Sequence, residues 1–309
     1  MKKRCVIALW TMCGLLGAAV AAVAVEAGGG QAEAKFTVQK GLVFAGEDQK
    51  LTLDLYRPQN PSGPLPCVIV IQGGGFRAQD GQRFRPYAES LAKNGFAAAL
   101  ISYRGRPDHE YRDTLADVRS AVRFIRTHSE EYGLDPDHIG AMGRSAGATL
   151  AVLLAVSDGV EGLKPPGGVA KESSRIRAAA GIAGVYDFVA RFTDKDQLAL
   201  QPNAEKKRRT NGEWIGAAFS PTDAHWLQAS AINHVNPADP PVLLLHSRND
   251  RTVPWLQSRD MHARLKQAGI AAEIEISNDG GHRGPATAEK RIIAFFKKTL
   301  TKKAAAPAR

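Results

Sequence analysis

The sequence predicts one α/β domain with a mostly parallel central sheet, helices on both faces and a short lid or cap insertion. Short apolar runs alternate with helical patterns along most of the chain. Several of these runs are continuously apolar, as expected for strands that are covered on both faces. A repeat of about 20 to 50 residues is absent from the sequence, which excludes a repeat architecture.

Changes of hydrophobic period mark the elements of the first half. Residues 51–56 alternate apolar and polar side chains, which predicts a half-exposed strand. Residues 67–71 and 96–101 are continuous apolar runs, typical of buried parallel strands, and residues 84–92 between them predict a helix. A second helix is indicated by an apolar stripe of Leu115, Val118, Val122 and Ile125, beside which lie Arg119, Arg123 and Arg126.

The second half continues this order. Strands are predicted over residues 138–142, 178–182, 242–246 and 272–276, and helices over residues 146–156, 256–267 and 288–298. The alternation of predicted strands and helices is interrupted in two stretches, residues 157–174 and 193–240. Connections of this length often form lids, so we expect a lid-like insertion at about residues 188–240.

Composition narrows the function classes. The 309 residues are 44% apolar and 23% charged, which excludes a disordered tail and a multi-span membrane protein. The net charge of +10 is concentrated at the chain ends and in one run at residues 206–209. A nucleic-acid-binding face would need more basic residues than those at the chain ends and in one run, so no nucleic acid partner is expected.

The N-terminus has the layout of a secretory signal peptide over residues 1–27. Three basic residues precede an apolar run at residues 5–25, and small residues allow cleavage after Ala24 or Ala27. A retained membrane anchor is the alternative, because the run is long enough to span a bilayer. With the leader removed, residues 28–309 are expected to be secreted or periplasmic, without stable membrane association. Cys67 alone would then remain, so no intramolecular disulfide is expected and the thiol is interpreted as a buried structural one.

A G-x-S-x-G motif at residues 143–147 separates a predicted strand from a predicted helix. A sharp turn at this place would lift the Ser145 hydroxyl above the edge of the sheet, and the glycines permit the tight backbone. Ser145 is therefore the candidate nucleophile. An ordinary glycine-rich turn is the alternative interpretation.

A serine nucleophile needs a base, and a group that orients the base. His282 follows two glycines just beyond the strand at residues 272–276, whereas the other histidines considered, His128, His138, His246 and His262, are less suitably placed. Asp250 follows the strand at residues 242–246 and is the candidate acid. Its rivals are Asp187, Asp223 and Asp239, of which Asp187 is the most credible. The carboxyl ends of parallel strands converge, so Ser145, Asp250 and His282 are expected to meet.

A reaction through a tetrahedral oxyanion needs fixed hydrogen-bond donors. The N–H of Ala146, directly after the nucleophile, would supply one. Residues 72–76, Gln-Gly-Gly-Gly-Phe, follow a buried strand, and the amide of Gly74 or Gly75 would supply the second. This segment is not a phosphate loop, because no Gly-Lys-Ser or Gly-Lys-Thr follows it.

With these pieces in place, the chain resembles the α/β-hydrolase superfamily. It is similar to esterases of the BD-FAE type (acetyl-xylan and feruloyl esterase-like) and to hormone-sensitive-lipase-like carboxylesterases. The resemblance rests on residues 72–76, 102–104, 133–147, 246–254 and 280–282, and it extends from about residue 50 to residue 300. It implies the triad Ser145, Asp250 and His282, and an acyl-enzyme mechanism on carboxylic esters without cofactor or metal. One residue departs from the family, which usually has His where this chain has Gln72.

Export would suit a small-molecule or polysaccharide ester, such as acetyl or feruloyl groups on plant polysaccharide. Trp214 and Trp226 are candidate sugar-stacking residues, with packing inside the lid as the alternative. The basic run at residues 206–209 is interpreted as a solvated loop, with attraction of an acidic polysaccharide as the alternative. Two other functions stay open, a prolyl-oligopeptidase-like serine peptidase and a non-catalytic α/β-hydrolase-like binding protein. The sequence leaves the oligomeric state open.

Overall fold

The chain is represented by a computed structural model, which describes residues 35–45, 51–163 and 172–301. The expected leader at residues 1–27, with both cleavage sites, lies outside the described residues. Within the described part, no helix combines the length and the apolar character needed to cross a membrane.

An eight-stranded sheet forms the centre, in the order β1-β2-β4-β3-β5-β6-β7-β8. Its strands are β1 (Phe36–Ala45), β2 (Leu51–Pro58), β3 (Leu65–Ile71), β4 (Ala97–Ile101), β5 (Leu134–Arg144), β6 (Ala178–Ile182), β7 (Val242–Ser247) and β8 (Ala272–Ser277). β2 is antiparallel to both of its neighbours, and all later pairs are parallel. The parallel strands therefore end at a common edge of the sheet, as expected from their buried apolar runs.

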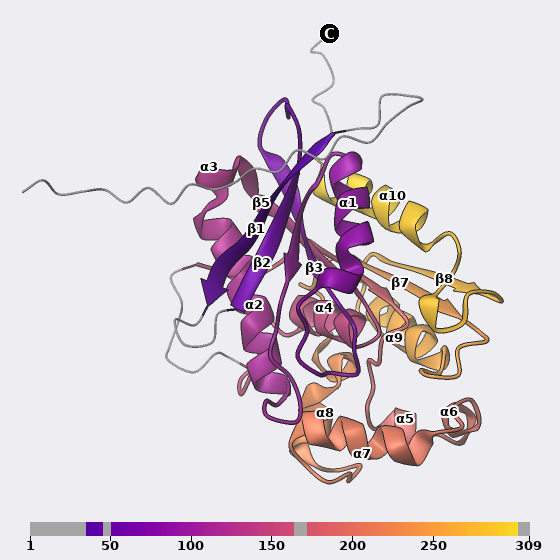
Figure 1. Ribbon diagram of the computed structural model, residues 1–309. Helices are drawn as coiled ribbons and strands as arrows, with labels where there is room; N and C mark the ends of the chain where they lie inside the picture. The colour runs from indigo at the N-terminus through magenta and orange to yellow at the C-terminus, as the bar shows by residue number, and fades with distance from the viewer. Residues whose placement is uncertain (1–34, 46–50, 164–171, 302–309) are drawn as a thin grey trace, which may run out of the picture.

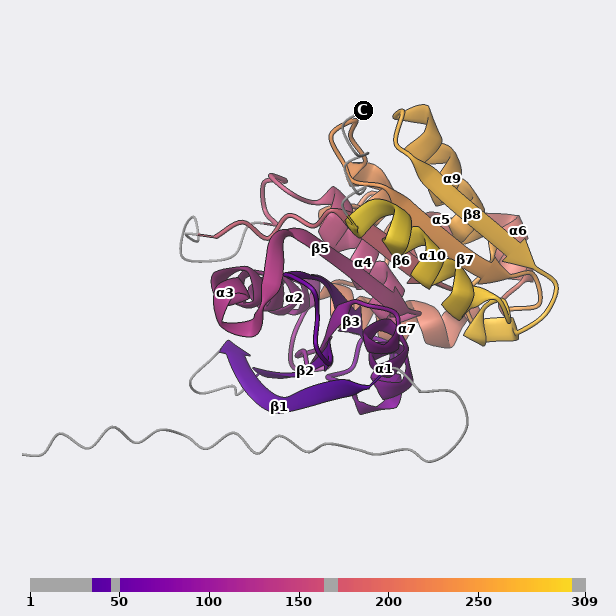
Figure 2. The same ribbon diagram turned by 90° about the horizontal axis from the view of Figure 1, so that it is seen from above.

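Helices cover both faces (Figures 1 and 2). α1 (Arg85–Lys93) and α10 (Ala288–Leu300) pack on one face, and α2 (Tyr111–Thr127), α4 (Ala146–Val156) and α9 (Leu256–Gln267) pack on the other. The short α3 (Ser129–Tyr132) precedes β5. All residues of α4 are buried, since its small and aliphatic side chains lie between the sheet and the other helices. The two apolar cores thus hold a rigid sheet whose carboxyl edge is free to carry loops.

The first two strands of the sheet differ from expectation. β1 was not predicted, because most of its residues are partly exposed and its pairing with β2 is interrupted by register shifts. Residues 51–56 form part of β2, which confirms the predicted strand, but the expected half-exposed character is wrong. β2 lies between β1 and β4, and most of its residues are buried.

The segment between β6 and β7 is largely helical. It contains α5 (Ala190–Thr193), α6 (Lys195–Ala199), α7 (Ala204–Ile215) and α8 (Ala224–Ala229), which lie together at the lower end of the molecule in Figure 1. The basic run at residues 206–209 is part of α7, so its interpretation as a loop is wrong. α7 ends at Gly216 in the left-handed conformation, a common helix stop.

The two tryptophans of this segment are packing residues. Trp214 and Trp226 are both 0% exposed. The ring of Trp214 stacks on Phe76 with centroids 3.9 Å apart, and its indole N–H donates to Thr114 Oγ1 at 3.1 Å. Trp226 packs edge-on against Phe219 and donates to the carbonyl of Ala218 at 3.1 Å. Sugar stacking needs an accessible ring face, so the candidate substrate-binding role of both residues is corrected to packing.

Cys67 is a buried, free thiol in the middle of β3. Burial raises its pKa to about 12, which keeps the thiol protonated and unreactive. The interpretation of Cys67 as a structural residue is thus confirmed.

Candidate active site

Ser145 sits on the sharp turn between β5 and α4. Its backbone has φ 57° and ψ −125°, and its N–H donates to the carbonyl of Ile182 at 2.8 Å. The turn requires small neighbours. A Cβ on Gly147 would lie 2.0 Å from the carbonyl oxygen of Ile71, so α4 approaches β3 closely only because this residue is glycine. The strained turn projects the serine at the carboxyl edge of the sheet.

His282 reaches Ser145 from the far end of the sequence. It lies on the single 3-10 turn Gly281–Arg283 after β8, and its Nε2 is 2.9 Å from Ser145 Oγ. Its Nδ1 is 2.8 Å from Asp250 Oδ2. The histidine loop is held by Asn249, whose side-chain oxygen accepts the N–H of Gly281 at 2.9 Å. The loops after β7 and β8 therefore fix both ring nitrogens.

Asp250 is the buried anchor of this chain of hydrogen bonds, and its side chain is 0% exposed. Its Oδ1 accepts the N–H groups of Thr252 and Val253 at 2.8 and 3.1 Å. Burial alone would raise the pKa of the carboxyl group, but hydrogen bonds from His246 and His282 outweigh burial and hold the pKa well below its usual range. Asp250 is therefore ionised at neutral pH.

His246 is a contact of Asp250 that the sequence reasoning undervalued. Its ring is 0% exposed, and its Nε2 lies 3.2 Å from Asp250 Oδ2 and 3.1 Å from the carbonyl oxygen of Val253. Both partners are acceptors, so Nε2 carries the hydrogen. Nδ1 lies 2.8 Å from Ser258 Oγ on α9. The available signal was the spacing of His246 and Asp250, four residues apart at the end of a strand, and this signal alone does not predict a hydrogen bond between them.

The rival residues take other roles. Asp187 accepts the N–H groups of Val189 and Ala190 at 2.9 and 2.8 Å, at the start of α5. Asp223 caps α8 and Asp239 bonds Asn236, and neither is bonded to a histidine of the site. His138 pairs with Asp135 at the amino end of β5, His262 bonds the carbonyl of Ala272, and His128 bonds that of Phe124.

The glycine loop after β3 runs beside the nucleophile. A Cβ on Gly73 would lie 3.1 Å from Ser145 Cβ, and the cavity next to Ser145 is lined by Gly75, Phe76 and Ala146. Gly74 packs against Gln79 instead, where a Cβ would lie 2.2 Å from Nε2. Of the two glycines proposed for the oxyanion site, Gly75 is the one that lines the cavity.

Gln72 holds this loop in place of the histidine that the family usually has. It is 2% exposed, and its side-chain oxygen accepts the N–H of Arg83 at 2.7 Å. Its amide nitrogen donates to Gln79 Oε1, and its carbonyl oxygen accepts the hydroxyl of Tyr103 at 2.5 Å. The glutamine thus fixes the loop through side chain and backbone together.

Replacing Gln72 with alanine is expected to lower kcat by about tenfold and to destabilise the fold by about 1 to 3 kcal/mol. The N–H of Arg83 would lose its acceptor on the buried Gln72 side chain, and the loop would lose two restraints. Ester turnover and urea unfolding measure both effects. Gln72→His is the matched control, because a ring nitrogen can accept the same N–H. Equal activity of Gln72→Ala and the wild type would contradict this role of Gln72.

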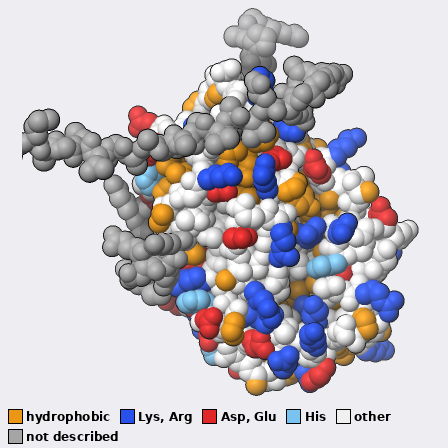
Figure 3. Space-filling model, viewed as in Figure 1, with side chains coloured by type: hydrophobic (Ala, Val, Ile, Leu, Met, Phe, Trp, Pro, Cys, Tyr) orange, Lys and Arg blue, Asp and Glu red, His pale blue; other side chains and the backbone are white. Residues whose placement is uncertain are grey.

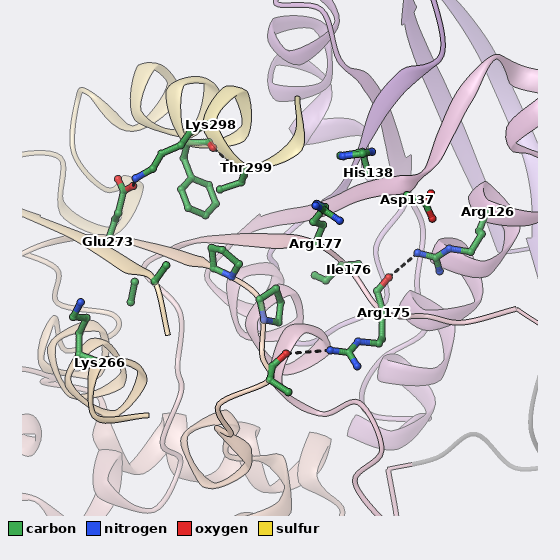
Figure 4. A pocket seen from close by; sticks show the side chains of 16 residues that line it. Arg126, Asp137, His138, Arg175, Ile176, Arg177, Lys266, Glu273, Lys298 and Thr299 are labelled. Carbon is green, nitrogen blue, oxygen red and sulfur yellow. Dashed lines mark hydrogen bonds and ion pairs between the residues drawn. The ribbon is translucent and has the colours of Figure 1, made fainter. Parts of the chain in front are cut away.

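The cavity beside Ser145 is small, at about 210 Å³. A larger hollow of about 990 Å³ lies at the opposite, amino edge of the sheet, between Arg126, Arg177 and Lys298 (Figure 4). It does not contain the serine, and several of its cations already have partners. Arg126 bonds the carbonyl of Arg175, Arg175 bonds that of Ala238, and Lys298 pairs with Glu273. The candidate site is therefore the smaller cavity at the carboxyl edge.

Over residues 35–45, 51–163 and 172–301, no group of three or more His, Cys, Asp or Glu is arranged to hold a metal ion. The groups that the site offers are a hydroxyl, an imidazole, a carboxylate and backbone amides. In this arrangement they can activate the hydroxyl as a nucleophile.

The fold and the serine turn define the class of protein. Among solved structures, a truncated form of a carbohydrate esterase from gut microbiota has the same fold, with a TM-score of 0.74 and 23% identity over 89% of this chain and 100% of that one. The expected α/β-hydrolase fold is thus confirmed. The BD-FAE family model matches residues 53–265, and the chain belongs to this family.

Curated relatives of this chain are named as esterases or ester hydrolases. A probable carboxylic ester hydrolase, LipM of Mycobacterium tuberculosis, is 31% identical over 70% of this chain and 48% of its own length. A probable isoprenylcysteine alpha-carbonyl methylesterase of Arabidopsis thaliana, ICMEL1, is 28% identical over 77% of this chain and 49% of its own. The chain therefore spans about half the length of these curated relatives. Thermogutta terrifontis esterase 2, solved as phosphonylated by sarin, is 26% identical with a TM-score of 0.69, over 84% of this chain and 93% of that one.

Proposed function

We propose that this chain is a serine hydrolase of carboxylic esters. The observation that carries the proposal is the unbroken chain of hydrogen bonds from Ser145 Oγ through both nitrogens of His282 to Asp250. A serine hydroxyl becomes an effective nucleophile when an oriented imidazole takes its proton. The names of the relatives, which are esterases and ester hydrolases, support carboxylic esters as the substrate class.

In the proposed reaction, Ser145 Oγ attacks the ester carbonyl carbon while His282 Nε2 accepts the hydroxyl proton. Asp250 holds the imidazole and stabilises its positive charge. The N–H groups of Ala146 and of Gly75 in the glycine loop receive the oxyanion. The C–O bond then breaks, His282 gives its proton to the leaving alcohol, and an acyl-serine remains. A water molecule then attacks the acyl-serine through the same steps, which releases the acid and restores the serine.

A fluorophosphonate probe tests this proposal directly. We expect one covalent adduct, located at Ser145 by mass spectrometry, together with hydrolysis of 4-nitrophenyl acetate. A non-catalytic binding protein would give neither. A prolyl-oligopeptidase-like peptidase would instead be labelled but would prefer peptide 4-nitroanilides to the ester, and this result would overturn the ester assignment.

The finer proposal is an exported esterase that acts on acylated carbohydrate. The leader-like residues 1–27 support export, and the carbohydrate esterase from gut microbiota that has the same fold supports carbohydrate esters. Release of acetate from acetylated xylan, compared with a series of 4-nitrophenyl acyl esters, tests the substrate. Activity restricted to long acyl chains would contradict it.

A further inference from the structure

The cavity beside Ser145 is lined by cations and by no carboxylate. Arg106 follows β4, Arg191 belongs to α5, and Lys206 and Lys207 belong to α7; no Asp or Glu is among the lining residues. Lys and Arg side chains are also prominent over the lower part of the molecule in Figure 3, where α5 to α8 lie. Three separate elements therefore bring positive charge to the side of the nucleophile.

Arg191 is a buried cation whose guanidinium is hydrogen-bonded to neutral groups. It is 2% exposed, and its guanidinium donates to Gln201 Oε1 at 3.0 Å, Asn211 Oδ1 at 3.2 Å and the carbonyl oxygen of Thr252 at 2.8 Å. Burial lowers its pKa to about 10, which leaves it charged at neutral pH. Asp250 interacts with it only at a distance and is already bonded to two imidazoles. A buried charge without a counterion is costly, so the free site favours an incoming anion.

The lysines of α7 continue this pattern. Burial lowers the pKa of Lys207, and repulsion from Arg191 and Lys206 lowers it further. Within the part of the chain that the structure describes, no carboxylate is recorded in an ion pair with Lys206 or Lys207. Their helix neighbours differ. Arg208 pairs with Glu205 and Arg209 with Glu213, while Arg106 at the cavity wall also pairs with Glu213. α7 thus neutralises its outer cations and leaves those facing the cavity unpaired.

We propose that this cavity is a carboxylate-binding subsite, and that the substrate is an ester that carries a carboxylate close to the scissile bond. The inference rests on the proposed ester hydrolysis and names its substrate class. A carboxylate beside Arg191 and Lys207 relieves the repulsion between them and takes charge-assisted hydrogen bonds. A cavity of about 210 Å³ holds a small acidic group next to the reacting carbonyl.

Two pairs of matched esters test the preference and show on which side of the ester the charge lies. For the acyl side, 4-nitrophenyl hemiglutarate is compared with the 4-nitrophenyl ester of glutaramic acid. For the alcohol side, 3-acetoxybenzoate is compared with 3-acetoxybenzamide. We expect kcat/KM to favour the carboxylate over its neutral amide by about tenfold or more in one pair. Equal or lower values for the carboxylate in both pairs would overturn the proposal.

Variants identify the side chains that cause the preference for the charged ester. Lys207→Gln and Arg191→Gln are each expected to reduce the charged-over-neutral ratio of kcat/KM by about tenfold, mainly through a higher KM for the charged ester. Arg208→Gln is the matched control, since it removes one positive charge from the same helix but does not line the cavity. Lys207 is only half-buried, so its variant keeps the test valid if Arg191→Gln does not fold. The assignment would be contradicted by either of two results. One is an unchanged charged-over-neutral ratio in folded Lys207→Gln, and the other is an equally reduced ratio in Arg208→Gln.

Binding without turnover separates this inference from the proposed function. In calorimetry with the Ser145→Ala variant, we expect glutarate to bind at least about tenfold more tightly than glutaramide, and the difference to shrink as salt is added. Glutarate binding by this variant, with no ester hydrolysis by the wild type, would reject the proposed reaction alone. Ester hydrolysis by the wild type without any preference for glutarate in the variant would reject the carboxylate subsite alone.

Discussion

Ser145→Ala is expected to lower kcat for 4-nitrophenyl acetate by at least about 10⁴-fold. The variant loses the hydroxyl that is hydrogen-bonded to His282 Nε2, so the imidazole has no hydroxyl to deprotonate and no acyl-enzyme forms. The backbone amides remain, which leaves a small residual rate over the uncatalysed reaction. Steady-state kinetics on purified protein, together with fluorophosphonate labelling, measure the loss.

Ser120→Ala is the matched control. The Ser120 hydroxyl donates to the carbonyl of Ala116 on α2 and does not line the cavity, so its loss should leave turnover and labelling unchanged. Circular dichroism should show the same fold for both variants. Wild-type turnover or labelling of folded Ser145→Ala would remove Ser145 from the mechanism.

Local sequence signals predicted most of the elements that carry these groups. Residues 146–156 form α4 with the expected bounds, and residues 178–182 form β6. These segments are recognisable because continuous apolar runs or glycines mark both their interior and their ends. The three groups that meet at the carboxyl edge follow from topology, since each lies just past a parallel strand.

Features that depend on tertiary environment were missed. β1 is half-exposed and irregular, so its period is weak. The chemistry of Arg191 depends on being buried beside Gln201 and Asn211, which no local pattern encodes. His246 was given no role in the site, because its hydrogen bond to Asp250 requires the loop after β7 to fold back on the strand. Sequence periodicity reports which residues are buried and does not report the partners they find there.

Trp214 shows that a function cannot be assigned to a residue until its packing partners are known. An aromatic residue in a long connection predicts either a sugar platform or an anchor, and only its neighbours decide. Its ring stacks on Phe76, directly after the glycine loop, and Phe76 lines the cavity. Trp214 therefore serves the site indirectly, because it fixes α7, with its two unpaired lysines, against the loop beside Ser145.

Asp250→Asn is expected to lower kcat by about 10⁴-fold, the size of effect known for removing the acid charge in serine triads. The N–H groups of Thr252 and Val253 would take the amide oxygen, so the amide NH2 would face both imidazoles. His282 would then accept at Nδ1 and carry its hydrogen on Nε2, where it cannot accept the serine proton. Asp187→Asn is the matched control, since Asp187 only caps α5, and its turnover should stay near that of the wild type.

The same variant should change the dependence of stability on pH. The pKa of Asp250 is depressed in the folded chain and is about 3.9 in the unfolded chain, so ionised Asp250 stabilises the fold fully above about pH 5. This contribution is lost as the pH falls below about 4 toward the folded pKa. The wild type should therefore exceed Asp250→Asn in free energy of unfolding most at neutral pH, and the gap should narrow in acid. Urea unfolding of both proteins across this range measures the gap. A gap that stays constant would mean that the two histidines do not hold the carboxylate ionised, because the stabilisation they give depends on its charge.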